Sequence, residues 1–227
     1  MTQDSPASGK GAGKKQPDAR MTRALIVFLV GLLVLLGGAG AYVWSLRGSG
    51  QDAGAQQASN GAVQVGGPFQ LVDHTGRTRT EADFAGQHML TYFGYTYCPD
   101  VCPTSLSIMT QALDLLEEQA PEVAAKIVPV FVTVDPERDD VAALAAYAEH
   151  FHPRMVALTG GPEQVAAAAK AYRVYYRKVE DESAGDYLMD HSSFIYLMGP
   201  DGLYVSHFLH NATAQEIAEG LKEQVGS

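Results

Sequence analysis

The distribution of apolar and polar residues divides the chain into three parts. An uncharged apolar segment spans residues 24–46, and a stretch rich in Gly, Ala, Gln and Ser spans residues 48–61. From Val63 onward, short apolar runs alternate with polar turns and with segments of helical periodicity. Because such alternation is typical of a chain that folds around a core, the third part predicts a folded domain over residues 62–227.

Within this domain, apolar runs of strand length occupy residues 88–95 and 127–134, and the second is typical of a strand buried on both faces. Alternating residues separated by turns predict β-hairpins at residues 68–80 and 193–207. Helical spacing predicts helices over residues 103–119, 141–150, 162–172 and 214–224. The first of these helices places four apolar side chains on one face: Leu106, Met109, Leu113 and Leu116.

The order of these elements is hairpin, strand, helix, strand, helix, helix, hairpin, helix. This order predicts an α/β fold with a mixed sheet. A thioredoxin-like fold, extended by an N-terminal β-hairpin, fits it. We expect one N-terminal transmembrane helix in addition.

The apolar segment at residues 24–46 has the length of a membrane span. As a helix rising ~1.5 Å per residue it is about 35 Å long, which is enough for a hydrocarbon layer of ~30 Å. Tyr42 and Trp44 lie where an aromatic belt is expected. We therefore expect an uncleaved membrane anchor, followed by a flexible linker over residues 47–61. A cleaved signal peptide is the alternative.

Charge is distributed unevenly along the chain. Residues 1–23 carry five basic and two acidic side chains, whereas the chain beyond Arg47 carries ten basic and 24 acidic ones. The basic tail is expected to stay in the cytoplasm, so the domain is exported. Because the tail is lysine-rich and contains acidic residues, unlike a mitochondrial presequence, we predict a bacterial cytoplasmic membrane with the domain in the periplasm. A domain this acidic would be repelled by phosphates, and no nucleic-acid partner is expected.

The two cysteines of the chain, Cys98 and Cys102, lie between the strand predicted at residues 88–95 and the helix predicted at residues 103–119. Pro103 suits the first position of that helix. The free N–H groups of the helix N-terminus should favour thiolates at both cysteines. Two cysteines cannot form a four-thiolate zinc site, and a disulfide between such near neighbours constrains the unfolded chain little. The pair is therefore predicted to carry chemistry.

Two kinds of chemistry fit this C-x-x-x-C pair. Two thiolates that point to the same side can share one soft metal ion, and Cu(I) is the ion that such ligands suit best. A dithiol between a strand and a helix is also the arrangement of thiol–disulfide oxidoreductases, although thioredoxins have two intervening residues. Enzymatic activity is left open here, since a reductase would use Cys98 and Cys102 as its redox-active pair.

Three motifs occur in one order along the chain: YCPDVCP at residues 97–103, VDPERD at residues 134–139 and DHSSFIYLMGPDG at residues 190–202. Together they resemble the Sco/SenC family of copper proteins, and the similarity extends from Gly66 to the C-terminus. The resemblance implies a thioredoxin-like fold that binds one copper ion per domain, as Cu(I), Cu(II) or both. It also implies a role in building the dinuclear copper centre on subunit II of cytochrome c oxidase, with room for a periplasmic copper-donating chaperone as a second partner.

Carried over position by position, the resemblance implies that Cys98 and Cys102 are the sulfur ligands of copper and that His191 is its imidazole ligand. Residue patterns alone would not select His191. Asp135 follows a buried strand, where α/β folds often place functional side chains, and by resemblance it lies near the copper site; it equally fits a turn-opening aspartate. Asp100 either adds negative charge between the cysteines or is a solvated turn residue.

The expected function is that of a membrane-anchored metallochaperone, or assembly factor, that delivers copper to subunit II of the oxidase by ligand exchange. The alternative is a thiol–disulfide oxidoreductase that reduces the cysteines of that subunit. A copper-linked redox sensor is not favoured, because residues 1–23 resemble no signalling domain.

Residues 172–177 (YRVYYR) are expected to form a strand or an edge. The other histidines match no metal-binding spacing and are expected on the surface or in the core: His74, His88, His150, His152, His207 and His210.

Overall fold

The structure is a computed structural model of the 227-residue chain, and it describes residues 64–181 and 186–226. The transmembrane helix expected at residues 24–46, the cytoplasmic tail expected at residues 1–23 and the linker expected at residues 47–61 lie outside this part. None of the helices in the described ranges combines the length and the apolarity needed to cross a bilayer.

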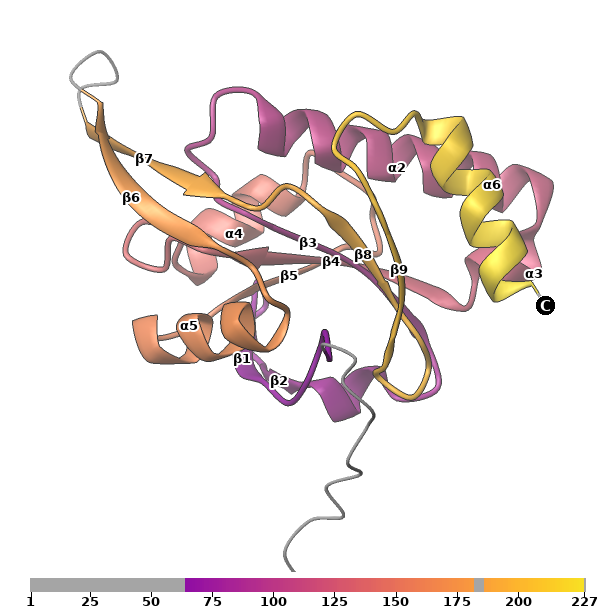
Figure 1. Ribbon diagram of the computed structural model, residues 1–227, viewed down its shortest axis with the longest axis horizontal. Helices are drawn as coiled ribbons and strands as arrows, with labels where there is room; N and C mark the ends of the chain where they lie inside the picture. Colours follow the sequence, from indigo (N-terminus) through magenta and orange to yellow (C-terminus); the bar gives the residue numbers. More distant parts are fainter. Residues whose placement is uncertain (1–63, 182–185, 227) are drawn as a thin grey trace, which may run out of the picture. The chain divides into compact units, whose positions relative to one another are not determined.

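A mixed sheet of seven strands, in the order β2-β1-β5-β4-β3-β8-β9, forms the centre of the described domain (Figure 1). Strands β3, β4 and β5 pair in parallel, whereas the hairpins β1–β2 and β8–β9 add antiparallel strands at the two edges. The strands are β1 (Gln70–Asp73), β2 (Thr78–Thr80), β3 (His88–Gly94), β4 (Ile127–Thr133), β5 (Val156–Thr159), β8 (Ile195–Met198) and β9 (Tyr204–Phe208).

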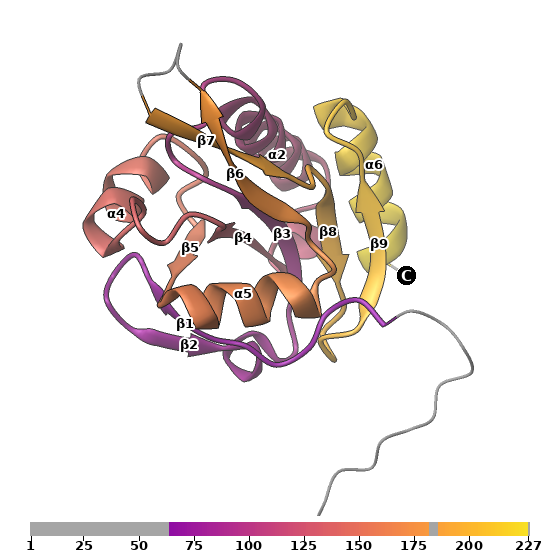
Figure 2. The ribbon, with the colours of Figure 1, turned by 60° about the vertical axis from the view of Figure 1, so that its left-hand side comes forward.

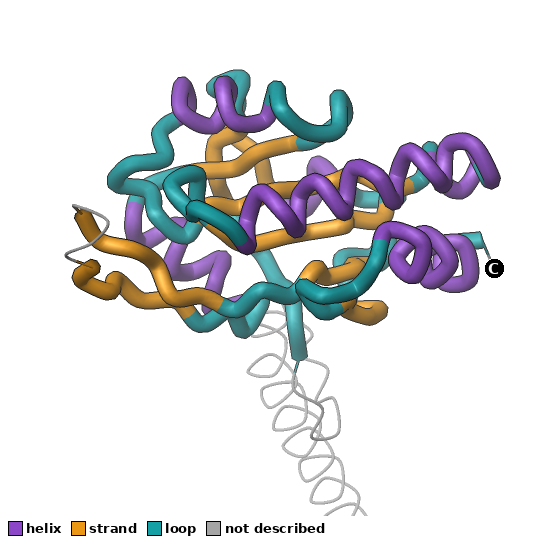
Figure 3. The backbone as a smooth tube through the Cα atoms, turned by 90° about the horizontal axis from the view of Figure 1, so that it is seen from above, coloured by secondary structure: helices purple, strands orange, loops and turns teal. Residues whose placement is uncertain are grey.

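Helices cover both faces of this sheet. They are α2 (Val101–Gln119), α3 (Pro121–Ala124), α4 (Val141–Ala148), α5 (Pro162–Ala171) and α6 (Ala214–Val225), with a 3-10 helix, η1, at Glu81–Phe84. Helices α2 and α4 lie on one face, where Phe131 of β4 contacts Tyr147 of α4. Helix α5 lies on the other face, where Phe93 of β3 contacts Tyr172 (Figure 2). Helix α6 lies beside α2 (Figure 3). These layers bury the central strands on both sides, as their apolar sequences predict.

A third hairpin lies outside the seven-stranded sheet. Strands β6 (Tyr176–Asp181) and β7 (Asp186–His191) pair with each other in a two-stranded sheet of their own. The hairpin projects past the end of the main sheet at which α2 begins (Figure 1). His191 is the last residue of β7, so it lies at the end of the hairpin that joins the main domain.

The α/β class, the mixed sheet, the thioredoxin-like order and the N-terminal hairpin β1–β2 are confirmed. Two helix boundaries were predicted two residues off, because α2 begins at Val101 rather than at Pro103 and α4 ends at Ala148 rather than at His150. The first intrahelical hydrogen bond runs from the N–H of Thr104 to the carbonyl of Asp100, so a proline at position 103 removes no bond. Strand β5 was missed, since its four residues are too few to show a periodicity.

Candidate metal centre

The two cysteines lie just beyond the end of the central strand β3. Cys98 is in the loop that follows the strand, and Cys102 is the second residue of α2. Close approach of α2 to the sheet requires glycine at position 94. A Cβ atom there would lie 2.9 Å from Sγ of Cys102 and 2.9 Å from Cε1 of Tyr92. Gly94 therefore lets the buried Cys102 thiol sit directly against the sheet.

His191 meets the two cysteines at this point. Its Nε2 atom lies 3.4 Å from Sγ of Cys102, and the N–H of Cys102 donates to Sγ of Cys98 over 3.4 Å. The two sulfur atoms and a ring nitrogen of His191 all lie within 4.8 Å of one another. Cys102 is fully buried, whereas Cys98 and His191 are partly exposed. The structure thus brings together the three residues that the sequence analysis named as ligands.

The orientation of the His191 ring suits metal binding. Its Nδ1 atom lies 3.0 Å from the carbonyl oxygen of Ser192, which can only accept, so Nδ1 carries the ring hydrogen. The lone pair of Nε2 is then directed toward Cys102. A hydrogen bond at the other ring nitrogen is the usual way in which proteins orient a ligating histidine. The rings of Tyr92 and Tyr95 contact His191 edge-on, at 6.1 and 5.9 Å between centroids.

The two thiols are electrostatically unequal. A hydrogen bond from the Cys102 thiol, together with nearby backbone N–H groups, lowers the pKa of Cys98 to about 3 against the opposing effect of burial. The same shared proton and burial raise the pKa of Cys102. At neutral pH the pair therefore holds one proton, with the negative charge on Cys98. Burial raises the pKa of the adjacent Tyr95 to about 12, so its hydroxyl stays neutral.

This donor set fits a soft metal ion. Two sulfurs and one imidazole nitrogen match the preferences of Cu(I), and with one further donor they also suit Cu(II). Both cysteines are free thiols in the structure. A bound cation would displace the proton that the two sulfurs share. Affinity should therefore depend on pH.

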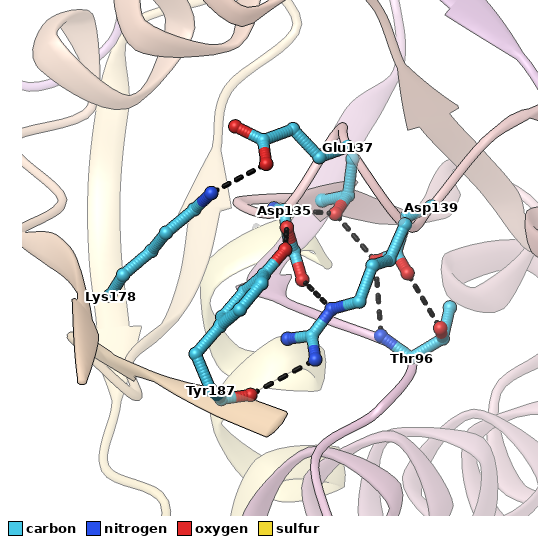
Figure 4. A network of polar contacts seen from close by, with 8 residues as sticks. Thr96, Asp135, Glu137, Asp139, Lys178 and Tyr187 are labelled. Carbon is cyan, nitrogen blue, oxygen red and sulfur yellow. Dashed lines mark hydrogen bonds and ion pairs between the residues drawn. The ribbon is translucent and has the colours of Figure 1, made fainter. Parts of the chain in front are cut away.

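The loop that carries Cys98 is tied to β4 by a buried carboxylate. Asp139, with no exposed surface, accepts hydrogen bonds from the backbone N–H and the hydroxyl of Thr96, at 3.0 and 2.6 Å (Figure 4). The hydroxyl of Thr133, at the end of β4, donates to the same carboxylate over 2.6 Å. Burial raises the pKa of Asp139. The contact fixes the backbone two residues before Cys98.

Asp135, the second candidate from the sequence, is 1% exposed and holds a neighbouring set of contacts. Its carboxylate accepts hydrogen bonds from Nε of Arg138, at 2.5 Å, and from the hydroxyl of Tyr187, at 2.9 Å (Figure 4). Tyr187 belongs to β7, the strand that ends at His191. Asp135 therefore does more than open a turn, since it links the end of β4 to the hairpin that carries His191. Lys178 of β6 adds one more contact between the hairpin and the loop after β4, because its ammonium group pairs with the carboxylate of Glu137 at 2.5 Å.

Asp100 directly precedes α2 and its side chain is exposed, as expected of a solvated turn residue. Sequence reasoning missed the residues whose contacts hold the Cys98 loop and the His191 hairpin in place: Thr96, Arg138, Asp139 and Tyr187. Two of them stand inside the VDPERD motif, which was the available signal. The contribution of β7 was not predictable, because its pairing with β6 depends on a register that only the folded chain sets.

A second group of metal-ligating side chains lies near the far end of α2. Asp114, Glu117 and His152 have donor atoms within 4.8 Å of one another. The N–H of Arg154 donates to Nδ1 of His152, which places the ring hydrogen on Nε2, 3.3 Å from the Glu117 carboxylate. Arg154 also pairs with Glu117 at 2.8 Å. Because Nε2 offers a hydrogen rather than a lone pair, His152 is a core histidine here, as expected.

A thioredoxin-like domain that gathers two cysteines and one histidine at the entrance of a helix defines a protein with a candidate thiolate–imidazole metal site. The chain belongs to the SCO1/SenC family: the profile of that family matches residues 57–226. The family assignment made from the three motifs is thus confirmed.

Two curated relatives are similar to this chain over most of their own length. The mitochondrial SCO2 homolog of Mus musculus is 42% identical over 221 residues, covering 96% of this chain and 84% of its own. The SCO2-like protein of Rickettsia felis is 36% identical over 206 residues, covering 89% and 98%.

Solved structures agree in fold and in sequence. The copper-bound structure of ScoI from Arabidopsis thaliana is 40% identical with a TM-score of 0.68, covering 71% of this chain and 98% of that one. The copper-bound structure of ScoI from Bradyrhizobium japonicum is 42% identical with a TM-score of 0.64, covering 70% and 99%. The bound copper belongs to those proteins.

Proposed function

We propose that this protein is a copper carrier that binds one copper ion through Cys98, Cys102 and His191. It would deliver that ion to the dinuclear copper centre of subunit II of cytochrome c oxidase. The observation that carries the proposal is the convergence of two sulfurs and an oriented imidazole nitrogen within 4.8 Å. Copper in the structures of similar Sco proteins supports the choice of metal.

Delivery would proceed by ligand exchange. Copper passes from the thiolates of this protein to those of the partner one bond at a time, so that it is never released as a free ion. Soft thiolates bind Cu(I) strongly enough to hold it and are also the ligands of the acceptor that the proposal names. A periplasmic chaperone would supply the ion.

The same proposal places the domain on the outer side of a bacterial cytoplasmic membrane. Support comes from the uncharged apolar residues 24–46, from the basic tail before them and from the full-length similarity to the protein of Rickettsia felis. Fractionation of cells that express the full chain tests this placement. Release of the domain by protease added to intact spheroplasts is the expected result, and protection from it would contradict the topology.

A thiol–disulfide oxidoreductase is the second candidate. The observation in its favour is the lowered pKa of Cys98 beside a protonated Cys102, which is the charge state of a reactive dithiol. Such an enzyme would reduce the cysteines of the oxidase subunit. It needs the two cysteines but no imidazole ligand.

One experiment separates the two candidates. The domain from Ala62 to Ser227, which is a compact unit with its own core, is reduced and loaded with copper in competition with a chromophoric chelator. A copper carrier binds one equivalent with a thiolate-to-Cu(II) absorption band, and His191→Ala weakens both. If His191→Ala binds copper like the wild type and reduces a disulfide substrate equally well, the carrier proposal fails and the reductase remains.

A further inference from the structure

The residue that completes the candidate metal centre stands on an element with its own sheet. His191 ends β7, whose pairing partner is β6, whereas both cysteines follow strand β3 of the main sheet. Strand pairing with β3 reaches only Ile195, which lies four residues after His191 and pairs with Tyr92. The distance between His191 and the cysteines therefore also depends on side-chain contacts between the hairpin and the main domain.

Tyr187 makes several of the contacts between the hairpin and the main domain. Its hydroxyl donates to the buried carboxylate of Asp135 over 2.9 Å, and its carbonyl accepts from Nη1 of Arg138, also over 2.9 Å. The guanidinium carbon of Arg138 lies 3.7 Å from the centroid of the Tyr187 ring. One tyrosine is thus held by its backbone, its ring and its hydroxyl, four residues before His191.

Arg138 also reaches the segment that carries the cysteines. Its guanidinium lies 4.8 Å from the ring centroid of Tyr97, the residue before Cys98, and 5.9 Å from that of Tyr95. The Tyr95 ring in turn contacts His191 edge-on. The side chain of Arg138 is only 13% exposed, so these contacts are shielded from water. A planar guanidinium can stack on rings and donate in fixed directions at once, which an ammonium cannot.

We propose that Arg138 and Tyr187 are positioning residues that hold His191 at the distance from Cys98 and Cys102 at which all three bind one metal ion. Neither side chain is a ligand. They act by locking the hairpin to the end of β4 and to the loop of Cys98. The proposal rests on the ligand set of the proposed function.

The test measures binding of Cu(II), added as its chloride, to the full-length chain in detergent micelles. Two conservative variants probe the contacts: Tyr187→Phe removes only a hydroxyl, and Arg138→Lys keeps the charge but loses the planar group. Each is made alone and in combination with His191→Ala. Arg177→Gln is the matched control, because Arg177 pairs with Asp190 inside the hairpin and is exposed.

Loss of contacts that orient a metal ligand typically weakens binding by about tenfold or more. We expect Tyr187→Phe and Arg138→Lys each to lower Cu(II) affinity by about tenfold. We also expect them to shift the electron paramagnetic resonance spectrum toward that of His191→Ala. In the His191→Ala background neither should have a further effect, since there is no imidazole left to position. Arg177→Gln should bind like the wild type.

Three results would overturn the proposal. Unchanged affinity and spectrum in both variants, or an equal loss in the His191→Ala background, would show that Arg138 and Tyr187 do not act through His191. Wild-type binding by His191→Ala would remove the histidine from the ligand set and so refute the proposed site itself. Circular dichroism melting of every variant shows whether a loss of copper affinity follows from unfolding. Should Arg138→Lys prove to be unfolded, the result for Tyr187→Phe, the smaller change, decides the test.

Discussion

The buried carboxylate of Asp139 holds Thr96 by two hydrogen bonds, one to its backbone N–H and one to its hydroxyl, across 43 residues of sequence. This pair connects the loop of Cys98 to the end of β4. It fixes the backbone of the loop rather than any ligand. The loop of Cys98 is therefore held in part by one aspartate that is distant from it in sequence.

Replacement of Asp139 should destabilise the domain. Asp139→Ala leaves three donors without their acceptor, those of Thr96 and the hydroxyl of Thr133. Each buried unsatisfied group costs about 1–3 kcal/mol, so we expect the free energy of unfolding to fall by roughly 3 kcal/mol. Urea denaturation measures it. Glu118→Ala, on the exposed face of α2, should change it by less than about 0.5 kcal/mol and serves as the control.

The lowered pKa of Cys98 predicts its reactivity. Because this pKa is about 3, Cys98 should remain a thiolate from about pH 8 down to about pH 5, and its alkylation by iodoacetamide should hardly slow over that range. Cys102→Ala removes the largest cause of the shift, so the midpoint should move up toward the ordinary value of 9.0. Mass spectrometry of the alkylated chain gives the rates. A rate that falls steeply below pH 8 in the wild type would contradict the shared proton.

The turn of the first hairpin predicts a dependence of stability on pH. Burial alone would raise the pKa of Asp73, but hydrogen bonds from Thr75, Arg77 and Arg79 lower it well below its ordinary 3.8. Asp73→Asn should therefore cost on the order of 2 kcal/mol at neutral pH. Since the folded pKa lies below the unfolded one, this difference is fully present above about pH 5 and is lost as the pH falls below 3.8. Urea titrations of both proteins at a series of pH values measure it, and a difference that grows in acid would refute the assignment.

Gly94 predicts a steric effect on the metal centre. In Gly94→Ala the new methyl group lies 2.9 Å from both the Cys102 sulfur and the Tyr92 ring, so α2 must move away from the sheet. We expect a loss of about 1–3 kcal/mol in stability together with weaker copper binding. Gly161→Ala is a suitable control, because its methyl group would lie at an ordinary 3.5 Å from Gln164. Equal copper affinity in the two variants would show that the close packing is not needed.

Much of the fold followed from the sequence because the central elements are long and strongly patterned. The nearly continuous apolar run of residues 127–134 predicts a buried strand by itself, and α2 has an apolar face that extends over about five turns. Strand β5 carries no such pattern in four residues, and the start of α2 depended on a hydrogen bond, from Thr104 to Asp100, that composition does not reveal.

The candidate site divides in the same way. Cys98 and Cys102 were predicted from their place between strand and helix, but His191 required the family resemblance, since a lone histidine has no local signature. Asp135 was predicted to lie near the site, and its partner Tyr187 was not predicted at all. Contacts such as theirs join residues 52 positions apart, so they follow from the packing of the hairpin rather than from any local motif.

The unequal burial of the two sulfurs sets an order of events for any encounter with a partner. An incoming thiol can approach Cys98, which is partly exposed, but it cannot reach Cys102, which has no exposed surface. The first bond to a partner should therefore form at the Cys98 side. It is either a metal–sulfur bond to a partner thiolate, or a mixed disulfide formed when the Cys98 thiolate attacks a disulfide of the partner and expels one partner thiolate. Cys102 would then act second, from within, either by letting the ion go or by attacking the disulfide. In either proposed function the exchange with a partner would be directional, because the outer cysteine makes the first contact and the inner one completes the exchange.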